Sequence, residues 1–134
     1  MEKLIKEYND KLQKANTYKD SNYLFKKYYK EFTSKSNKHP YEIYDGFRNR
    51  QREILLKLFK DNGFYDGIKL KNIETGKTGI LTILQCYCDL YPIIKWIKKD
   101  GTTSRYNYKR ISKSYNEERI IYALNNYYTK MEVE

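Results

Sequence analysis

Apolar residues in the first half of the chain recur at the three- and four-residue spacing of a helix. The spacing predicts helices over residues 2–16, 21–34 and 40–62. Asp20 or Ser21 is expected to cap the second helix, and Pro40 suits the start of the third. Gly63 is free to take a left-handed conformation after the third helix, with Phe64 packing back against it.

After Gly63 the pattern changes to short apolar and β-branched runs separated by turn residues. Asp100-Gly101 is a strong hairpin signal. The runs predict a small antiparallel sheet or barrel with strands at 68–73, 80–88, 92–97 and 102–108.

The last segment returns to helical spacing. Ser114 followed by Glu117 forms a capping box before an apolar run that ends near Met131. The fold class expected is therefore α+β: N-terminal helices, a small sheet or barrel, and a C-terminal helix. The corresponding segments are a helical region at 1–63, a β module at 64–113 and a helix at 114–134, packed as one compact unit.

Charge is distributed unevenly over the 134 residues, whose formal net charge is +10. Residues 1–61 hold 15 basic and 9 acidic side chains, and residues 62–113 hold 10 and 4, so each segment carries +6. Residues 114–134 hold 2 and 4, a net −2. The middle segment is the densest in positive charge, which favours a polyanionic partner.

Several classes of protein are excluded by what the sequence lacks. It has no apolar run of about 18 residues, the length of a membrane span, so a cytoplasmic protein is expected. Cys86, Cys88 and His39 are too few ligands for a four-coordinate zinc site. Both cysteines are interpreted as reduced packing residues, and neither a metal nor another cofactor is expected.

The stretch from Gly67 to Ile111 resembles a small SH3-like barrel of the KOW/Tudor type. The resemblance rests on Ile68–Asn72, Thr75–Ile80, Pro92–Trp96 and the closing Asp100-Gly101-Thr102 with Tyr106. Modules of this type bind RNA, DNA or peptides through loops and an aromatic cluster. The resemblance implies that Trp96, Tyr106 and Tyr108 supply such a cluster here.

Two sets of basic residues are candidate sites for phosphate binding. Lys69 and Lys71 alternate with apolar neighbours and so share one face of a strand. Arg48 and Arg52 lie four residues apart and share one face of the third helix. The alternatives are a solvated lysine-rich face with core tyrosines, and intramolecular pairing of Asp45 with Arg48 and of Glu53 with Lys57. The first set comprises Lys69, Lys71, Lys77, Lys95, Trp96, Lys98, Lys99, Arg105, Tyr106, Tyr108, Lys109 and Arg110.

Signatures of catalysis are incomplete. Gly76-Lys77-Thr78 ends like a phosphate-binding loop, but Lys71 stands where that loop needs a glycine. His39 has no partnered nucleophile, and Tyr28 and Tyr29 have the spacing of core residues. We therefore expect a non-catalytic protein.

The function predicted is binding of a nucleic acid or a nucleoprotein complex. Short basic chains of this general type resemble accessory proteins of phages and mobile elements. The alternative is a phage-encoded, anti-CRISPR-like inhibitor of a host nuclease defence complex. Such an inhibitor would engage an acidic protein surface, or the guide RNA within the complex, in the bacterial cytosol.

Overall fold

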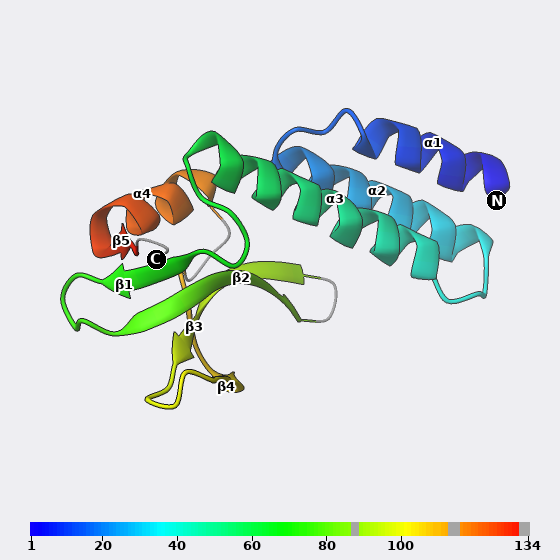
Figure 1. Ribbon diagram of the computed structural model, residues 1–134. Helices are drawn as coiled ribbons and strands as arrows, with labels where there is room; N and C mark the ends of the chain where they lie inside the picture. Colours follow the sequence, from blue (N-terminus) through cyan, green and yellow to red (C-terminus); the bar gives the residue numbers. More distant parts are fainter. Residues whose placement is uncertain (87–88, 113–115, 132–134) are drawn as a thin grey trace. The chain divides into compact units, whose positions relative to one another are not determined.

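The computed structural model describes residues 1–86, 89–112 and 116–131, and it has the α+β architecture expected from the sequence (Figure 1). By its internal contacts the chain divides into two compact units, the first chiefly Met1–Ile54 and the second Leu55–Cys86 with Leu90–Glu134. In chain order the elements are α1 (Glu2–Leu12), α2 (Tyr18–Lys35), α3 (Tyr41–Asp61), β1 (Lys69–Asn72), β2 (Thr78–Cys86), β3 (Asp89–Ile97), β4 (Thr103–Arg110), α4 (Glu117–Tyr127) and β5 (Tyr128–Lys130).

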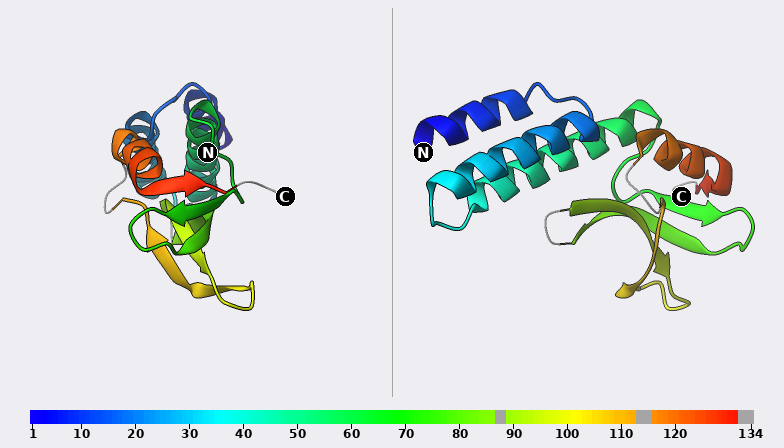
Figure 2. Two further views of the ribbon diagram at one scale, coloured as in Figure 1. Left: turned by 60° about the vertical axis from the view of Figure 1, so that its left-hand side comes forward. Right: turned by 180° about the vertical axis from the view of Figure 1, so that it is seen from behind.

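The first unit is a layer of three helices, in which α1, α2 and the first part of α3 run side by side (Figures 1 and 2). Aromatic residues provide much of its core. Tyr8 and Tyr28 are fully buried with their rings 5.2 Å apart, and the Tyr8 hydroxyl donates a 2.8 Å hydrogen bond to the Ile43 carbonyl. Tyr29 packs against the same cluster. Tyrosine thus fills this core with its polar end satisfied, and the prediction that Tyr28 and Tyr29 are core residues is confirmed.

The junction between α1 and α2 differs from the prediction. The first helix ends at Leu12 rather than residue 16, and the Ala15 carbonyl accepts a 2.9 Å hydrogen bond from Arg50 Nε. Thr17, not Asp20 or Ser21, caps α2 by accepting a 3.2 Å bond from the Asp20 amide. Thr17 has the extended backbone angles of an N-cap residue, so α2 begins only after it.

The end of α3 follows the prediction. Gly63 adopts a left-handed conformation with φ of 83°, and the Phe64 amide donates a 2.8 Å bond to the Phe59 carbonyl. Phe64 is buried in the core of the second unit. Glycine is needed here because a side chain strains this backbone conformation. No helix in the part of the chain that the structure describes is long and apolar enough to cross a membrane.

The second unit is built on one open sheet of five strands in the order β4-β3-β2-β1-β5. Antiparallel registers pair Leu70 of β1 with Gly79 of β2, and Ile94 of β3 with Lys109 of β4. The sheet is not closed into a barrel, because β4 and β5 remain its two edges. The similarity to SH3-like barrels stays a prediction.

One face of this sheet carries the core of the second unit. Leu70, Leu81 and Ile94 project from three adjacent strands into a buried cluster. Helix α4, which lies over β1 and β5 in Figure 1, adds Ile120 and Leu124, and the last turns of α3 add further apolar side chains. Ile93, which alternates with Ile94 along β3, is also fully buried, so part of the opposite face is covered as well.

Gly79 lies on β2 where the Ile94 side chain and the Lys95 backbone of β3 leave no room for a side chain. A Cβ atom there would lie 2.4 Å from Ile94 Cγ2 and 2.8 Å from the Lys95 carbonyl oxygen. Only a residue without a side chain fits this distance.

Strand β5 was not predicted. Residues 128–130 continue the helical spacing of α4, but Tyr128 instead adopts extended geometry and pairs with Asn72, while Lys130 pairs with Leu70. Hydrogen bonding to the open edge of β1 overrides the local pattern. The cap of α4 is Asn116, which accepts a 3.0 Å bond from the Arg119 amide, and the predicted cap Ser114 lies outside the described residues.

The two cysteines were expected to be packing residues. Cys86 is a free thiol at the end of β2, and it is exposed, so the packing prediction is wrong for this residue. It lies at the last position of the strand, beyond the part that contacts the core. Cys88 lies outside the described residues.

Candidate nucleic-acid interface

The β3–β4 hairpin ends in the predicted Asp100-Gly101 turn. Gly101 has φ of 86°, its amide donates a 2.9 Å bond to the Lys98 carbonyl, and the Lys98 amide donates a 2.8 Å bond to the Thr102 carbonyl. Asp100 Oδ1 accepts bonds from the Thr102 hydroxyl at 2.6 Å and the Thr102 amide at 2.9 Å. Both bonds lower the pKa of Asp100, and the bond from the Thr102 hydroxyl has the larger effect. The turn thus uses its one carboxylate internally and leaves two lysines, Lys98 and Lys99, exposed.

Strand alternation decides which basic residues share the face opposite the core. Leu70 and Ile94 are core residues, so their neighbours Lys69, Lys71 and Lys95 project from the other face. Tyr108 pairs directly with Lys95, and Arg110 pairs with Ile93, so both lie on that face too. We call these five residues, Lys69, Lys71, Lys95, Tyr108 and Arg110, the basic face. Lys109 pairs with Ile94 and projects from the core side instead.

Strand β4 is an edge strand, and every residue in it except Ser104 is exposed. Between the pairs Lys95–Tyr108 and Ile97–Thr103, β3 advances by two positions and β4 by five. The extra residues of β4 form a bulge, a feature that redirects side chains at the edges of sheets. Tyr106 lies in this stretch and is 79% exposed, whereas Tyr108 is 36% exposed. We call Lys98, Lys99, Arg105 and Tyr106 the hairpin tip.

Arginine side chains lie over tyrosine rings both at the hairpin tip and on the basic face. The Arg105 guanidinium is 5.0 Å from the Tyr106 ring centroid, and the Arg110 guanidinium is 3.7 Å from that of Tyr91. Each contact puts a cation beside an aromatic ring. Tyr91 is missing from the sequence-based prediction, although it alternates with Ile93 and Lys95 and could have been found from that spacing.

Trp96 does not join the other two aromatic residues of the predicted cluster. It is partly buried and packs against the core of the second unit. Lys77, from the turn between β1 and β2, lies over its ring at 5.8 Å. The indole is therefore a packing residue, because alternation along β3 directs it to the same side as Ile94.

The charges of the sheet are balanced differently from those of the helices. The five ion pairs described all lie within helices and join residues three or four apart, for example Glu31 with Lys35 and Lys57 with Asp61. Among the described residues, none of these sheet-unit cations forms an ion pair: Lys69, Lys71, Lys77, Lys95, Lys98, Lys99, Arg105 and Lys109. Their charge is therefore available to an outside partner.

The second candidate set, Arg48 and Arg52, belongs to the first unit. Arg48 is ion-paired with Asp45, as the intramolecular alternative predicted. The predicted pair of Glu53 with Lys57 is wrong. Glu53 forms an ion pair with Arg50, and Lys57 forms one with Asp61. Arg52 is half-buried and has no ion pair within the described ranges. The paired Arg48 weakens the case for phosphate binding on this helix.

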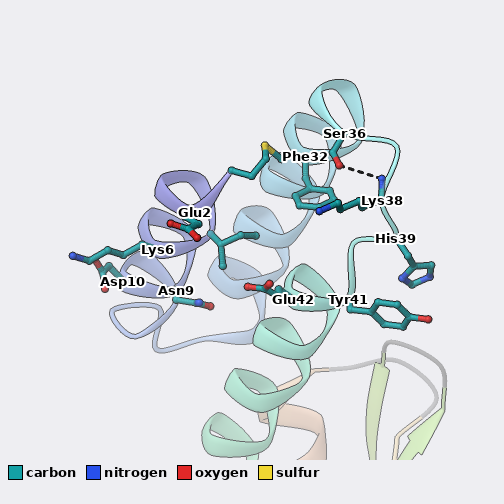
Figure 3. Close-up of a pocket in the computed structure, with 12 residues that line it drawn as sticks. Glu2, Lys6, Asn9, Asp10, Phe32, Ser36, Lys38, His39, Tyr41 and Glu42 are labelled. Atoms are coloured by element: carbon teal, nitrogen blue, oxygen red, sulfur yellow. Dashed lines mark hydrogen bonds between the residues drawn. The ribbon is translucent and has the colours of Figure 1, made fainter.

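A cavity of about 670 Å³ in the first unit opens between α1, the end of α2 and the start of α3 (Figure 3). Its charged lining is mixed in sign: Glu2, Lys6, Asp10, Lys38 and Glu42. His39 lies at its rim with its ring 4.0 Å from that of Tyr41. A lining of alternating charge does not suit a polyanion, and His39 is engaged in ring packing.

Among the described residues, no group of three His, Cys, Asp or Glu side chains could hold a metal ion. No protein-family model, no curated protein and no solved structure matches this chain. Its function must therefore be argued from the site alone.

Proposed function

We propose that this chain is a non-catalytic protein that binds nucleic acid, free or within a nucleoprotein complex, through the basic face and the hairpin tip. The observation that carries the proposal is the contrast between the cations of the sheet that form no ion pair among the described residues and the helices, whose ion pairs are internal. Binding of a polyanion neutralises such charges and releases condensed counterions, which favours association.

The arrangement of the cations suits an extended phosphate backbone. Lys69 and Lys71 lie two residues apart on one strand, a separation of about 7 Å, and Lys95 and Arg110 continue the same face on β3 and β4. Lys98 and Lys99 extend the positive charge to the turn. Cations spread along one surface in this way match the repeating charge of a nucleic acid better than a single small anion.

The proposal predicts binding that weakens steeply with salt. Each phosphate contact contributes a slope of about −0.7 to −0.9 in log K against log salt. We would measure fluorescence anisotropy of labelled DNA and RNA over a salt series. The first variant is Lys98→Gln with Lys99→Gln, which is expected to reduce the slope by about 1.5 if both lysines contact phosphate.

A matched control is Lys35→Gln with Lys57→Gln. This pair removes the same number of charges, but both lysines are exposed and ion-paired within helices. The control should leave the slope close to that of the unmodified protein. Binding that is insensitive to salt, or an equal loss in both double variants, would refute a role for the hairpin tip in phosphate contact.

A further inference from the structure

Strand β4 carries two exposed aromatic residues, Tyr106 and Tyr108. Resting on the proposed function, we infer that the preferred ligand is a single strand, with its bases stacked on Tyr106 and Tyr108. Tyr106 is the most exposed of the large hydrophobic residues described, and Tyr108 follows it by two residues on the same edge strand. Neither ring has a place in either buried core.

The spacing of these two positions along β4 suits unstacked bases. Residues two apart along a strand are separated by about 7 Å, which is twice the roughly 3.4 Å rise between stacked bases in a duplex. A ring at each position therefore matches an extended single strand whose base faces are free. In a duplex those faces are covered by neighbouring bases, so the rings would gain little from contact.

Cations lie where the phosphates of such a strand would run. The Arg105 guanidinium is 5.0 Å from the Tyr106 ring, while Lys95 is directly across the strand pair from Tyr108. A basic groove interleaved with exposed aromatic rings is the arrangement by which proteins hold single strands without reading sequence. Lys98 and Lys99 in the turn, which form no ion pair among the described residues, extend this row of cations.

The test compares one labelled mixed-sequence DNA strand, alone and annealed to its complement, at one fixed salt concentration. The unmodified protein should bind the single strand at least about tenfold more tightly. Tyr106→Ala and Tyr108→Ala should each lower the affinity for the single strand about fivefold or more and leave duplex binding unchanged. The Phe variants keep the ring and should retain the affinity.

Tyr122→Ala is the matched control, because Tyr122 is 59% exposed on α4 of the same unit but lies away from β4 in the chain. It should change neither affinity. Equal affinity for the single strand and the duplex, or equal losses of affinity for both in the tyrosine variants, would overturn the stacking inference. The proposed function would still stand if the affinity fell with salt as expected. If neither ligand bound at all, the proposed function would fail with it.

Discussion

Replacing Gly79 by alanine tests how closely β2 packs against β3. The added Cβ atom would lie 2.4 Å from Ile94 Cγ2, 2.8 Å from the Lys95 carbonyl oxygen and 3.2 Å from Trp96 Cε3. Ordinary carbon contacts are about 3.5 to 4.0 Å. Ile94 is fully buried and β-branched, so its side chain cannot rotate away, and a backbone oxygen moves only with its strand.

The expected cost follows from two opposing effects. Overpacking of a well-filled core destabilises by about 1 to 3 kcal/mol, and the backbone contact places this site near the upper end. Gly→Ala returns about 0.4 to 1 kcal/mol by restricting the unfolded chain. We therefore expect Gly79→Ala to lower the free energy of unfolding by about 2 kcal/mol.

The measurement is urea unfolding followed by circular dichroism, with Thr78→Ala as the control. Thr78 is adjacent on β2, is half-buried, and pairs with Lys71 on the opposite face, so its truncation should cost less than about 1 kcal/mol. Unchanged or increased stability of Gly79→Ala would show that β3 does not press on β2 at this point.

Three further outcomes follow from hydrogen bonds in the two units. Tyr8→Phe should destabilise by about 1 kcal/mol, because it removes the buried bond to the Ile43 carbonyl, whereas Tyr23→Phe, at an exposed ring, should have no effect in the same urea titration. Burial raises the pKa of Tyr8 above its ordinary value of about 10, so as the pH rises the unfolded chain loses the hydroxyl proton before the folded chain does. The free energy of unfolding should therefore fall as the pH rises above about 10, and it should fall less steeply in Tyr8→Phe. The hydrogen bonds from Thr102 lower the pKa of Asp100, so they stabilise the turn at pH values above the ordinary carboxyl pKa of about 4, and the turn weakens as the pH falls through the lowered pKa. The NMR signal of the Thr102 amide should report this loss of the hydrogen bond, and Asp100→Asn should abolish the pH dependence of that signal.

Local patterns in the sequence were enough to predict most elements of the fold. The spacing of apolar residues located the four helices of the described ranges. The left-handed cap at Gly63 and the turn at Asp100-Gly101 were correctly predicted from residue type. These features depend on neighbours in the chain. Strand β5 was missed because its partner, β1, is distant in sequence and no local signal marks the pairing.

The candidate site was predicted less completely for the same reason. Alternation correctly placed Lys69 and Lys71 on one face, but Lys109 and Arg110 had been grouped together although neighbours on a strand must face opposite ways. Trp96 was expected to join an aromatic cluster with Tyr106 and Tyr108, but it packs against the core of the second unit, a contact that no local pattern marks. The contact of Arg110 with Tyr91 joins two strands and becomes evident only once their register is known.

The pairing of β5 with β1 has a consequence for the order in which the sheet unit can be completed during synthesis. Residues 69–72 leave the ribosome long before residues 128–130, and until then the outer hydrogen-bonding edge of β1 has no partner strand. A nascent chain at that stage exposes an open edge of the kind that templates aggregation. The hydrogen bonding of this sheet is therefore completed only after residues 128–130 have been synthesised, and until then the edge of β1 is open to pairing with another chain.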